Sequence, residues 1–259
     1  MLSEKIIEWL RTTGFPLEME AASAFRSVGF DVRQSSTFPD PQSDKGREID
    51  VLATDPDIRG VIEISFVVEC KSSSKPWVVL TSDDALSGYN RLFAFGVTSE
   101  AARKVLAHRI TELPLLGRHI KRPEHGGYGF RQAFAKEPDP AYAAAMAALK
   151  ACHGVAQDRA PPSIPRLAFA FPVIVIDSPL FECSRSHEGE LKLTPVAHSE
   201  FLFSAHIPEH IGCCVKVVSR GHLLEFAAWA KELARTIREE LKNEEERAFT
   251  TRSEGANGT

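Results

Sequence analysis

An apolar run over residues 61–68 that ends in Glu69-Cys70-Lys71 constrains the fold of this chain more than any other feature. Side chains of a β-strand alternate between its two faces, so Glu69 and Lys71 point to one face and Cys70 to the other. The run therefore predicts a largely buried strand with a carboxylate and an ammonium side by side at its end. Such a pair can bind a divalent metal and position a water. The alternative is a solvated Glu–Lys pair, which is a common arrangement.

A second acid lies among apolar residues shortly before this run. Asp50 belongs to a strand-like segment over residues 48–54, and 18 residues separate it from Glu69. Buried acids are usually paired, so Asp50 could instead form an ion pair with Arg47 or Lys71. Glu48 shares the strand face of Asp50 and competes with it as a metal ligand.

A third acid lies on the apolar side of a predicted helix. Pro16 begins this helix, which covers residues 17–28, and Gly29 ends it. A helical wheel places Glu18 beside Phe25, whereas Glu20 faces water. An acid among core residues is unfavourable unless a partner such as a metal satisfies it. The alternative role of Glu18 is a favourable interaction with the dipole at the first helical turn.

This order of an acid on a helix, Asp50 on a strand and Glu-x-Lys on the next strand resembles the PD-(D/E)xK nuclease superfamily. The resemblance covers about the first third of the chain, and Ile49 stands where the family name has proline. It implies an α/β fold with a restriction endonuclease-like core (αβββαβ), in which helices flank a mixed central sheet. It also implies a Mg²⁺-dependent nuclease acting on DNA, with Mn²⁺ able to substitute for Mg²⁺. The alternative is an inactive nuclease-fold module that binds nucleic acid or supports an assembly.

The resemblance also implies a role for each site residue. Asp50 and Glu69 would bind the metal together with the Cys70 carbonyl. Glu18 would bind a second metal or orient a metal-bound water. Lys71 would orient and help to deprotonate the attacking water, or stabilise the developing negative charge.

The remaining pattern predicts one domain over residues 1–242. Pro172 interrupts the most hydrophobic run, residues 167–176, and predicts either a bulge or a regular strand limited to residues 173–177. Residues 97–137 predict an irregular basic insertion, and the tail from residue 243 to 259 is expected to be disordered. Further elements are expected as strands at residues 30–38, 180–184, 190–194, 200–204 and 213–219, and as helices at 3–12, 83–95, 140–152 and 221–241.

The charge of the chain is uneven. The net charge is −4, yet residues 101–136 carry eight Lys and Arg against two acids, a local charge of +6. Cations neutralise phosphates, so this stretch predicts a phosphate-binding surface, with a solvated loop as the alternative. The expected substrate contacts are Ser73, Lys75, Arg118, Lys121 and Arg122.

Other features limit the location and the rival functions. With 43% apolar residues, 25% charged residues, five scattered cysteines and no long apolar segment, the chain is expected to be cytoplasmic, reduced and free of membrane spans. A homodimer is compatible with the sequence. His206-x-x-Glu-His210 matches a zinc-hydrolase pattern, but Pro208 falls inside the helix that this pattern needs, so a surface loop is expected.

Overall fold

The computed structural model describes residues 1–40, 42, 46–87, 89–109, 113–120, 126–136, 138–157, 166–207 and 209–248. A 3-10 turn, Arg220–His222, comes directly before the C-terminal helix α7 (Leu223–Glu240). The helices are α1 (Leu2–Arg11), α2 (Phe15–Ser27), α3 (Arg91–Phe95), α4 (Glu100–Arg109), α5 (Leu116–Ile120), α6 (Pro140–Ala156) and α7 (Leu223–Glu240). The strands are β1 (Asp31–Pro39), β2 (Gly46–Asp55), β3 (Ile62–Lys71), β4 (Trp77–Ser82), β5 (Val97–Thr98), β6 (Gly126–Gln132), β7 (Leu167–Ile176), β8 (Leu180–Arg185), β9 (Leu191–Val196), β10 (His198–Ile207) and β11 (Glu209–Ser219).

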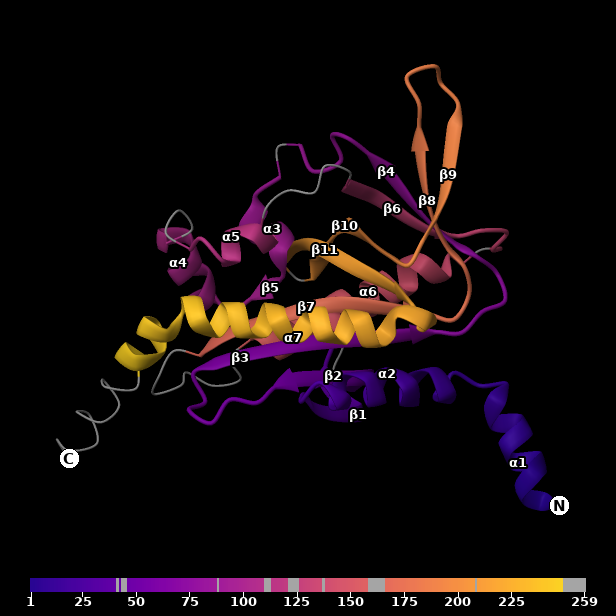
Figure 1. Ribbon diagram of the computed structural model, residues 1–259, viewed down its shortest axis with the longest axis horizontal. Coiled ribbons are helices and arrows are strands. Elements are labelled where there is room, and N and C mark those ends of the chain that lie inside the picture. Colours follow the sequence, from indigo (N-terminus) through magenta and orange to yellow (C-terminus); the bar gives the residue numbers. More distant parts are fainter. Residues whose placement is uncertain are drawn as a thin grey trace.

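The described strands form one mixed sheet in the order β1-β2-β3-β7-β11-β10-β6-β4-β8-β9, with β5 paired to β7 (Figure 1). The first three strands form an antiparallel meander, and β7 then adds parallel to β3. The chain thus runs from a helix through three antiparallel strands to a later helix and a parallel strand. The expected α/β class with a mixed sheet flanked by helices is confirmed.

Three parallel strands end together at one edge of the sheet. The register of β3 with β7 pairs Lys71 with Ile176, and that of β11 with β7 pairs Ser219 with Ile176. All ten residues of β7 are buried, as expected for a central strand that is covered on both faces. This carboxyl edge brings together Glu69, Lys71 and the loops that follow the parallel strands.

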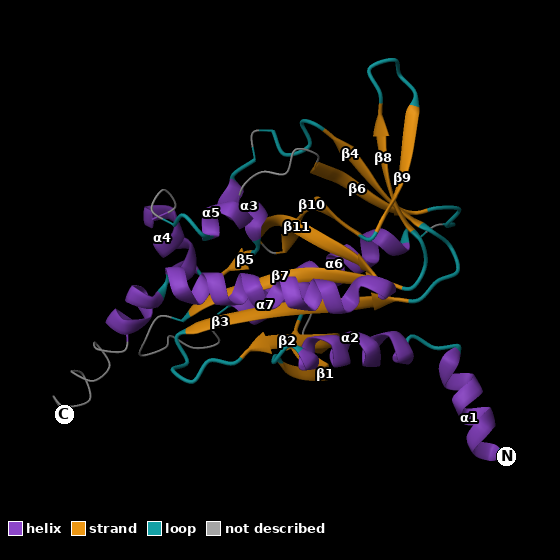
Figure 2. Ribbon diagram, viewed as in Figure 1, coloured by secondary structure: helices purple, strands orange, loops and turns teal. Residues whose placement is uncertain are grey.

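Helices cover both faces of the sheet (Figure 2). Helices α2 and α7 pack on one face in a core that contains Phe25, Phe66 and Phe226, whereas α6 packs on the other face through its alanines. Pro16 at the start of α2 and Gly29 beyond its end, where φ is 86°, limit this helix to about the predicted length.

The region between β3 and α6, which includes the insertion at residues 97–137, differs from the prediction. Residues 83–87 form turns, and among the described residues of 83–95 only the short α3 is helical. Strand β4 was missed, although its residues alternate between buried and partly exposed positions as a half-buried strand does. The insertion is also more regular than expected, because β6 pairs with β4 and β10 inside the sheet.

The prediction for Pro172 was wrong. Strand β7 runs without a register shift through this residue, which pairs with Val67 of β3. On the other side of β7, β5 pairs with Phe169 and Ala170, whereas β11 pairs from Val173 onwards. Pro172 thus lies between two partner strands, where a residue without an N–H donor is tolerated.

The two ends of the chain differ in packing. Helix α1 has no buried residue and projects from the carboxyl edge of the sheet (Figure 1). Residues 242–248 are helical, and ion pairs of Glu244 with Arg109 and of Glu245 with Arg59 join them to the rest of the protein. The expectation of disorder was therefore wrong for residues 243–248, and the rest of the tail lies outside the described residues. Among the described helices, none combines the length and apolar character needed to cross a bilayer.

Candidate active site

The sheet opens locally at Asp50. Strand β2 pairs with β3 from Val51 onwards, opposite Val68, and its pairing with β1 skips the register position of Asp50 and Ser35. Ser35 has a φ of 51°, which is unusual for a residue other than glycine. In these three described strands Asp50 therefore has no register partner on either side.

The side chain of Asp50 fills the gap between the strands. Its Oδ2 accepts a hydrogen bond of 2.8 Å from the backbone N–H of Cys70 on β3. One residue on each side of Cys70, Glu69 and Lys71 form an ion pair, with 2.6 Å between Glu69 Oε1 and Lys71 Nζ. The break thus places one carboxylate across from a second carboxylate and an ammonium.

Glu18 of α2 approaches the same break. Burial raises the pKa of its carboxyl, and the negative charges of Asp50, Glu48 and Glu69 raise it further, whereas Lys71 opposes them. Charges interact this way only when they are close together. Asp50, Glu69 and Lys71 therefore meet at the break, and Glu18 of α2 lies close enough for their charges to act on its carboxyl.

The two strand carboxyls also have raised pKa values. Burial is the main cause for both Asp50 and Glu69, and for Glu69 the charge of Asp50 adds to it. Lys71 lowers the pKa of both carboxyls, and so does the Cys70 N–H for Asp50, but neither effect outweighs burial. The cluster therefore carries more negative charge than its surroundings compensate, and an added cation would stabilise it.

The proposed pairing of Asp50 with Arg47 is wrong, because Arg47 forms an ion pair with Asp40. Glu48 is exposed, and its negative charge raises the pKa values of both Asp50 and Glu18. It therefore remains near the cluster as a competing ligand.

The donor set suits a hard divalent cation only in part. Carboxylate oxygens are the ligands that Mg²⁺ prefers, and Asp50 and Glu69 each use one oxygen in the contacts above. However, no three His, Cys, Asp or Glu side chains in the described ranges are grouped closely enough to hold a metal ion. Metal binding would thus require side-chain rotation that brings the carboxylates closer together. The Cys70 thiol is buried among apolar residues, and burial raises its pKa, so its sulfur is a poor ligand.

Sequence reasoning missed Asp177, which follows β7 directly. Its carboxylate accepts hydrogen bonds from the Ser72 hydroxyl and from the Ser73 N–H, the latter at 2.8 Å. It therefore holds the loop that follows Lys71. Its position after a run of ten apolar residues, beside the end of a parallel neighbour, was the available signal.

The expected substrate contacts have mixed outcomes. Ser73 Oγ accepts from the N–H of Lys75, and Lys75 Nζ donates to the Phe134 carbonyl at 2.9 Å, so both residues support the loop. Arg118 lies in α5, but its side chain is outside the described part of the chain, as are Lys121 and Arg122. The role of these five residues in substrate binding stays a prediction.

Acids from other segments pair with several cations of the basic stretch. Arg109 bonds to Glu244, Arg131 lies 3.3 Å from Asp139, and Lys104 lies 2.6 Å from Glu100 just before the stretch. The local excess of +6 is therefore reduced on the folded protein.

The zinc-hydrolase pattern lies on a hairpin instead of a helix. His206 of β10 pairs in register with His210 of β11, while Pro208 is outside the described residues. The pattern needs both histidines and the glutamate on one helical face, so the zinc-hydrolase reading is wrong on geometry.

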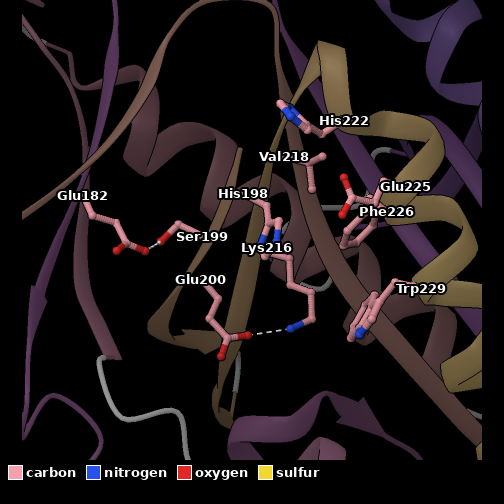
Figure 3. Close-up of a pocket in the computed structure, with 10 residues that line it drawn as sticks. All are labelled: Glu182, His198, Ser199, Glu200, Lys216, Val218, His222, Glu225, Phe226 and Trp229. Carbon is pink, nitrogen blue, oxygen red and sulfur yellow. Dashed lines mark hydrogen bonds and ion pairs between the residues drawn. The ribbon is translucent and has the colours of Figure 1, made fainter. Parts of the chain in front are cut away.

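A separate cavity of about 380 Å³ lies between α7 and strands β8, β10 and β11 (Figure 3). Lys216 Nζ lies 2.5 Å from Glu200 and 4.8 Å from the centroid of the Trp229 ring. Glu182 accepts a hydrogen bond from Ser199 on the opposite wall. Glu182, Glu200 and Glu225 outnumber this one lysine in the lining, which also contains His198 and His222, and the cavity shares no residue with the Asp50 cluster.

Comparisons with known proteins do not identify the chain. No protein-family model matches it, and neither a curated protein nor a solved structure matches it significantly. The geometry of the site is therefore the basis for its function.

Proposed function

We propose that this protein is a divalent-metal-dependent nuclease with a restriction endonuclease-like core that hydrolyses phosphodiester bonds in DNA. One observation carries the proposal: Asp50, Glu69 and Lys71 meet where β2 separates from β3, and Glu18 of α2 lies close enough for their charges to act on its carboxyl. The order of elements supports it, because α2, the β1–β2–β3 meander, α6 and the parallel β7 follow the αβββαβ pattern.

Each residue has a role in this proposal. Bound Mg²⁺ would supply positive charge at the scissile phosphate and lower the pKa of a water. Asp50 and Glu69 would hold the cation through their carboxylate oxygens, and Glu18 would orient a water beside them. Lys71 would stabilise the negative charge that develops on the phosphate.

Cleavage assays with plasmid and linear DNA test the proposal. We expect cleavage with Mg²⁺ or Mn²⁺ and none with a chelator. Glu69→Gln and Lys71→Met should each reduce the rate on the order of 100-fold or more, because each removes a charge that acts in the transition state.

The matched control is Glu63→Gln on the same strand. Glu63 lies six positions before Glu69, on the same strand face, and forms an ion pair with Arg166. This variant should keep wild-type cleavage. Full activity of Glu69→Gln, or wild-type protein that never cuts DNA with either metal, would contradict the proposal.

A second candidate is a nuclease-fold module that binds nucleic acid without cutting it. The Lys71–Glu69 ion pair and the lack of a three-ligand group in the described residues favour this candidate. Metal-independent DNA binding without cleavage, equal in wild type and Glu69→Gln, would select it.

A further inference from the structure

Phe134 combines two unfavourable features at one residue. Its side chain is 84% exposed, and its φ is 58°, in the left-handed region. The N–H of Ala135 donates to the carbonyl of Gln132, so Phe134 is the third residue of a four-residue turn. A positive φ at this position favours glycine or asparagine, and a bulky side chain is strained there. Neither core packing nor turn geometry accounts for a phenylalanine at this position.

The turn is attached to the loop that follows the Glu-x-Lys strand. The N–H of Ala133 donates to the Pro76 carbonyl at 2.9 Å, and Lys75 Nζ donates to the Phe134 carbonyl at 2.9 Å. Asp177 holds the beginning of the same loop through Ser72 and Ser73. The backbone of the turn that carries the exposed ring is therefore held beside the loop that follows β3, and Lys75, which bonds to the Phe134 carbonyl, lies four residues after Lys71.

We propose that Phe134 is a binding site for an unpaired DNA base, which stacks on the ring while the phosphate of that strand lies at the Asp50–Glu69 cluster. Every base has a π-face, so an exposed aromatic ring binds bases with little dependence on sequence. The hydrogen-bonded turn already restrains the backbone that carries the ring, so binding costs little backbone freedom. The inference rests on the proposed function and adds that the preferred substrate contains single-stranded DNA.

The turn geometry gives a sharp test. Phe134→Gly and Phe134→Asn remove the ring and relieve the backbone strain, so the thermal midpoint Tm should stay equal or rise. Affinity for a single-stranded oligonucleotide should fall about 5- to 100-fold without divalent metal, measured by fluorescence anisotropy. Quenching of a 2-aminopurine base by stacking should be lost in both variants and kept in Phe134→Trp.

The control is Ile58→Gly. Ile58 is fully exposed in the turn between β2 and β3, at the opposite end of the strands from Lys71. This variant should bind and quench like wild type. Unchanged affinity and quenching in Phe134→Gly would overturn the inference, and so would a lower Tm with unchanged affinity, which would indicate a structural ring.

The outcomes separate this inference from the proposed function. If wild-type protein cleaves DNA and Phe134→Gly cleaves and binds DNA equally well, the stacking site is contradicted and the nuclease proposal is not. Wild type that binds and quenches the oligonucleotide but never cleaves contradicts the nuclease proposal only. Ring-dependent binding of a protein in place of DNA would assign Phe134 to a protein interface and overturn the stacking site.

Discussion

Asp50 shows how one residue can be costly for folding and useful for function. It lies where β2 loses both neighbouring strands, and burial raises the pKa of its carboxyl despite the hydrogen bond from Cys70. An acid whose pKa is raised in the folded state destabilises that state when it ionises. The negative charge at this position therefore has no stabilising role in the metal-free protein.

Asp50→Asn should keep the fold and lose the activity. The asparagine oxygen can still accept from the Cys70 N–H, whereas the charge that raises the pKa of Glu69 is removed. At neutral pH we expect a Tm equal to wild type or up to about 4 °C higher. The gain should disappear at acidic pH, since the wild-type carboxyl is then protonated and its penalty is lost.

Calorimetry from acidic to neutral pH checks this expectation, with cleavage measured in parallel. A raised pKa means that wild-type stability falls as pH rises from the ordinary pKa of Asp50 through its folded value. A larger Tm difference at acidic pH than at neutral pH would contradict the assignment of burial as the dominant cause.

Sequence periodicity was sufficient for part of the acid cluster. The alternation in β3 placed Glu69 and Lys71 on one face, and the helical wheel of α2 placed Glu18 on the apolar side, because faces of regular elements follow from spacing alone. Asp50 was preferred to Glu48, which shares its strand face, only through the resemblance to the nuclease pattern. Asp177 and Phe134 could not be identified in this way. Their significance depends on loops that meet in space, and spacing along the chain does not determine those contacts.

At the scale of elements, the loop after β3 depends on the end of β7. Asp177 accepts hydrogen bonds from Ser72 and Ser73, and Ser178 Oγ donates to the Lys75 carbonyl. The end of β7 therefore holds the loop that follows Lys71, and the same loop is hydrogen-bonded to the Phe134 turn.

Asp177→Ala should loosen this loop. The variant removes both acceptors, so we expect about 10-fold weaker cleavage and faster proteolysis between residues 72 and 76, with the strands intact. Asp177→Asn keeps one acceptor oxygen, which can still accept from the Ser73 N–H, and should have an intermediate effect. Equal protease sensitivity of the alanine variant and wild type would show that the carboxylate does not hold the loop.

Elements with one dominant hydrophobic periodicity were predicted well. Elements that depend on pairing with distant strands were predicted poorly. The expected strands of the meander, the C-terminal hairpins and α7 are confirmed within a few residues. Strand β4 was missed because its proline-bounded start resembled the end of β3, and β6 because its glycines resembled a loop. Pairing with distant strands stabilises both elements.

On the scale of the whole molecule, the sheet consists of two parts joined by one residue pair. Strands β1, β2, β3, β7, β11 and β10 form one part, and β6, β4, β8 and β9 form the other. Strands β10 and β6 are described over their whole lengths, and the only register pair between them is Phe201 with Gly127. Apolar packing of Phe130 and Phe201, with ring centroids 5.1 Å apart, supports this junction.

Gly127→Ala tests the junction. An added Cβ would lie 2.3 Å from the Glu200 carbonyl oxygen and 2.6 Å from Val79, so backbone must move. We expect a loss of about 1–3 kcal/mol in the free energy of unfolding, measured by urea denaturation. Gly117→Ala, whose Cβ would meet no atom within 4 Å, is the control and should be neutral or slightly stabilising. Equal stability of the two variants would show that the junction is not tightly packed.

The narrow connection through Gly127 has a mechanical consequence. Phe134 belongs to the smaller part, whereas all three carboxyls and Lys71 belong to the larger one. One buried apolar cluster spans this connection, with Trp77 and Phe130 from the smaller part and Ile174 and Phe201 from the larger part. The two parts therefore hold the Phe134 ring and the carboxyls at one separation, and a substrate would have to match that separation.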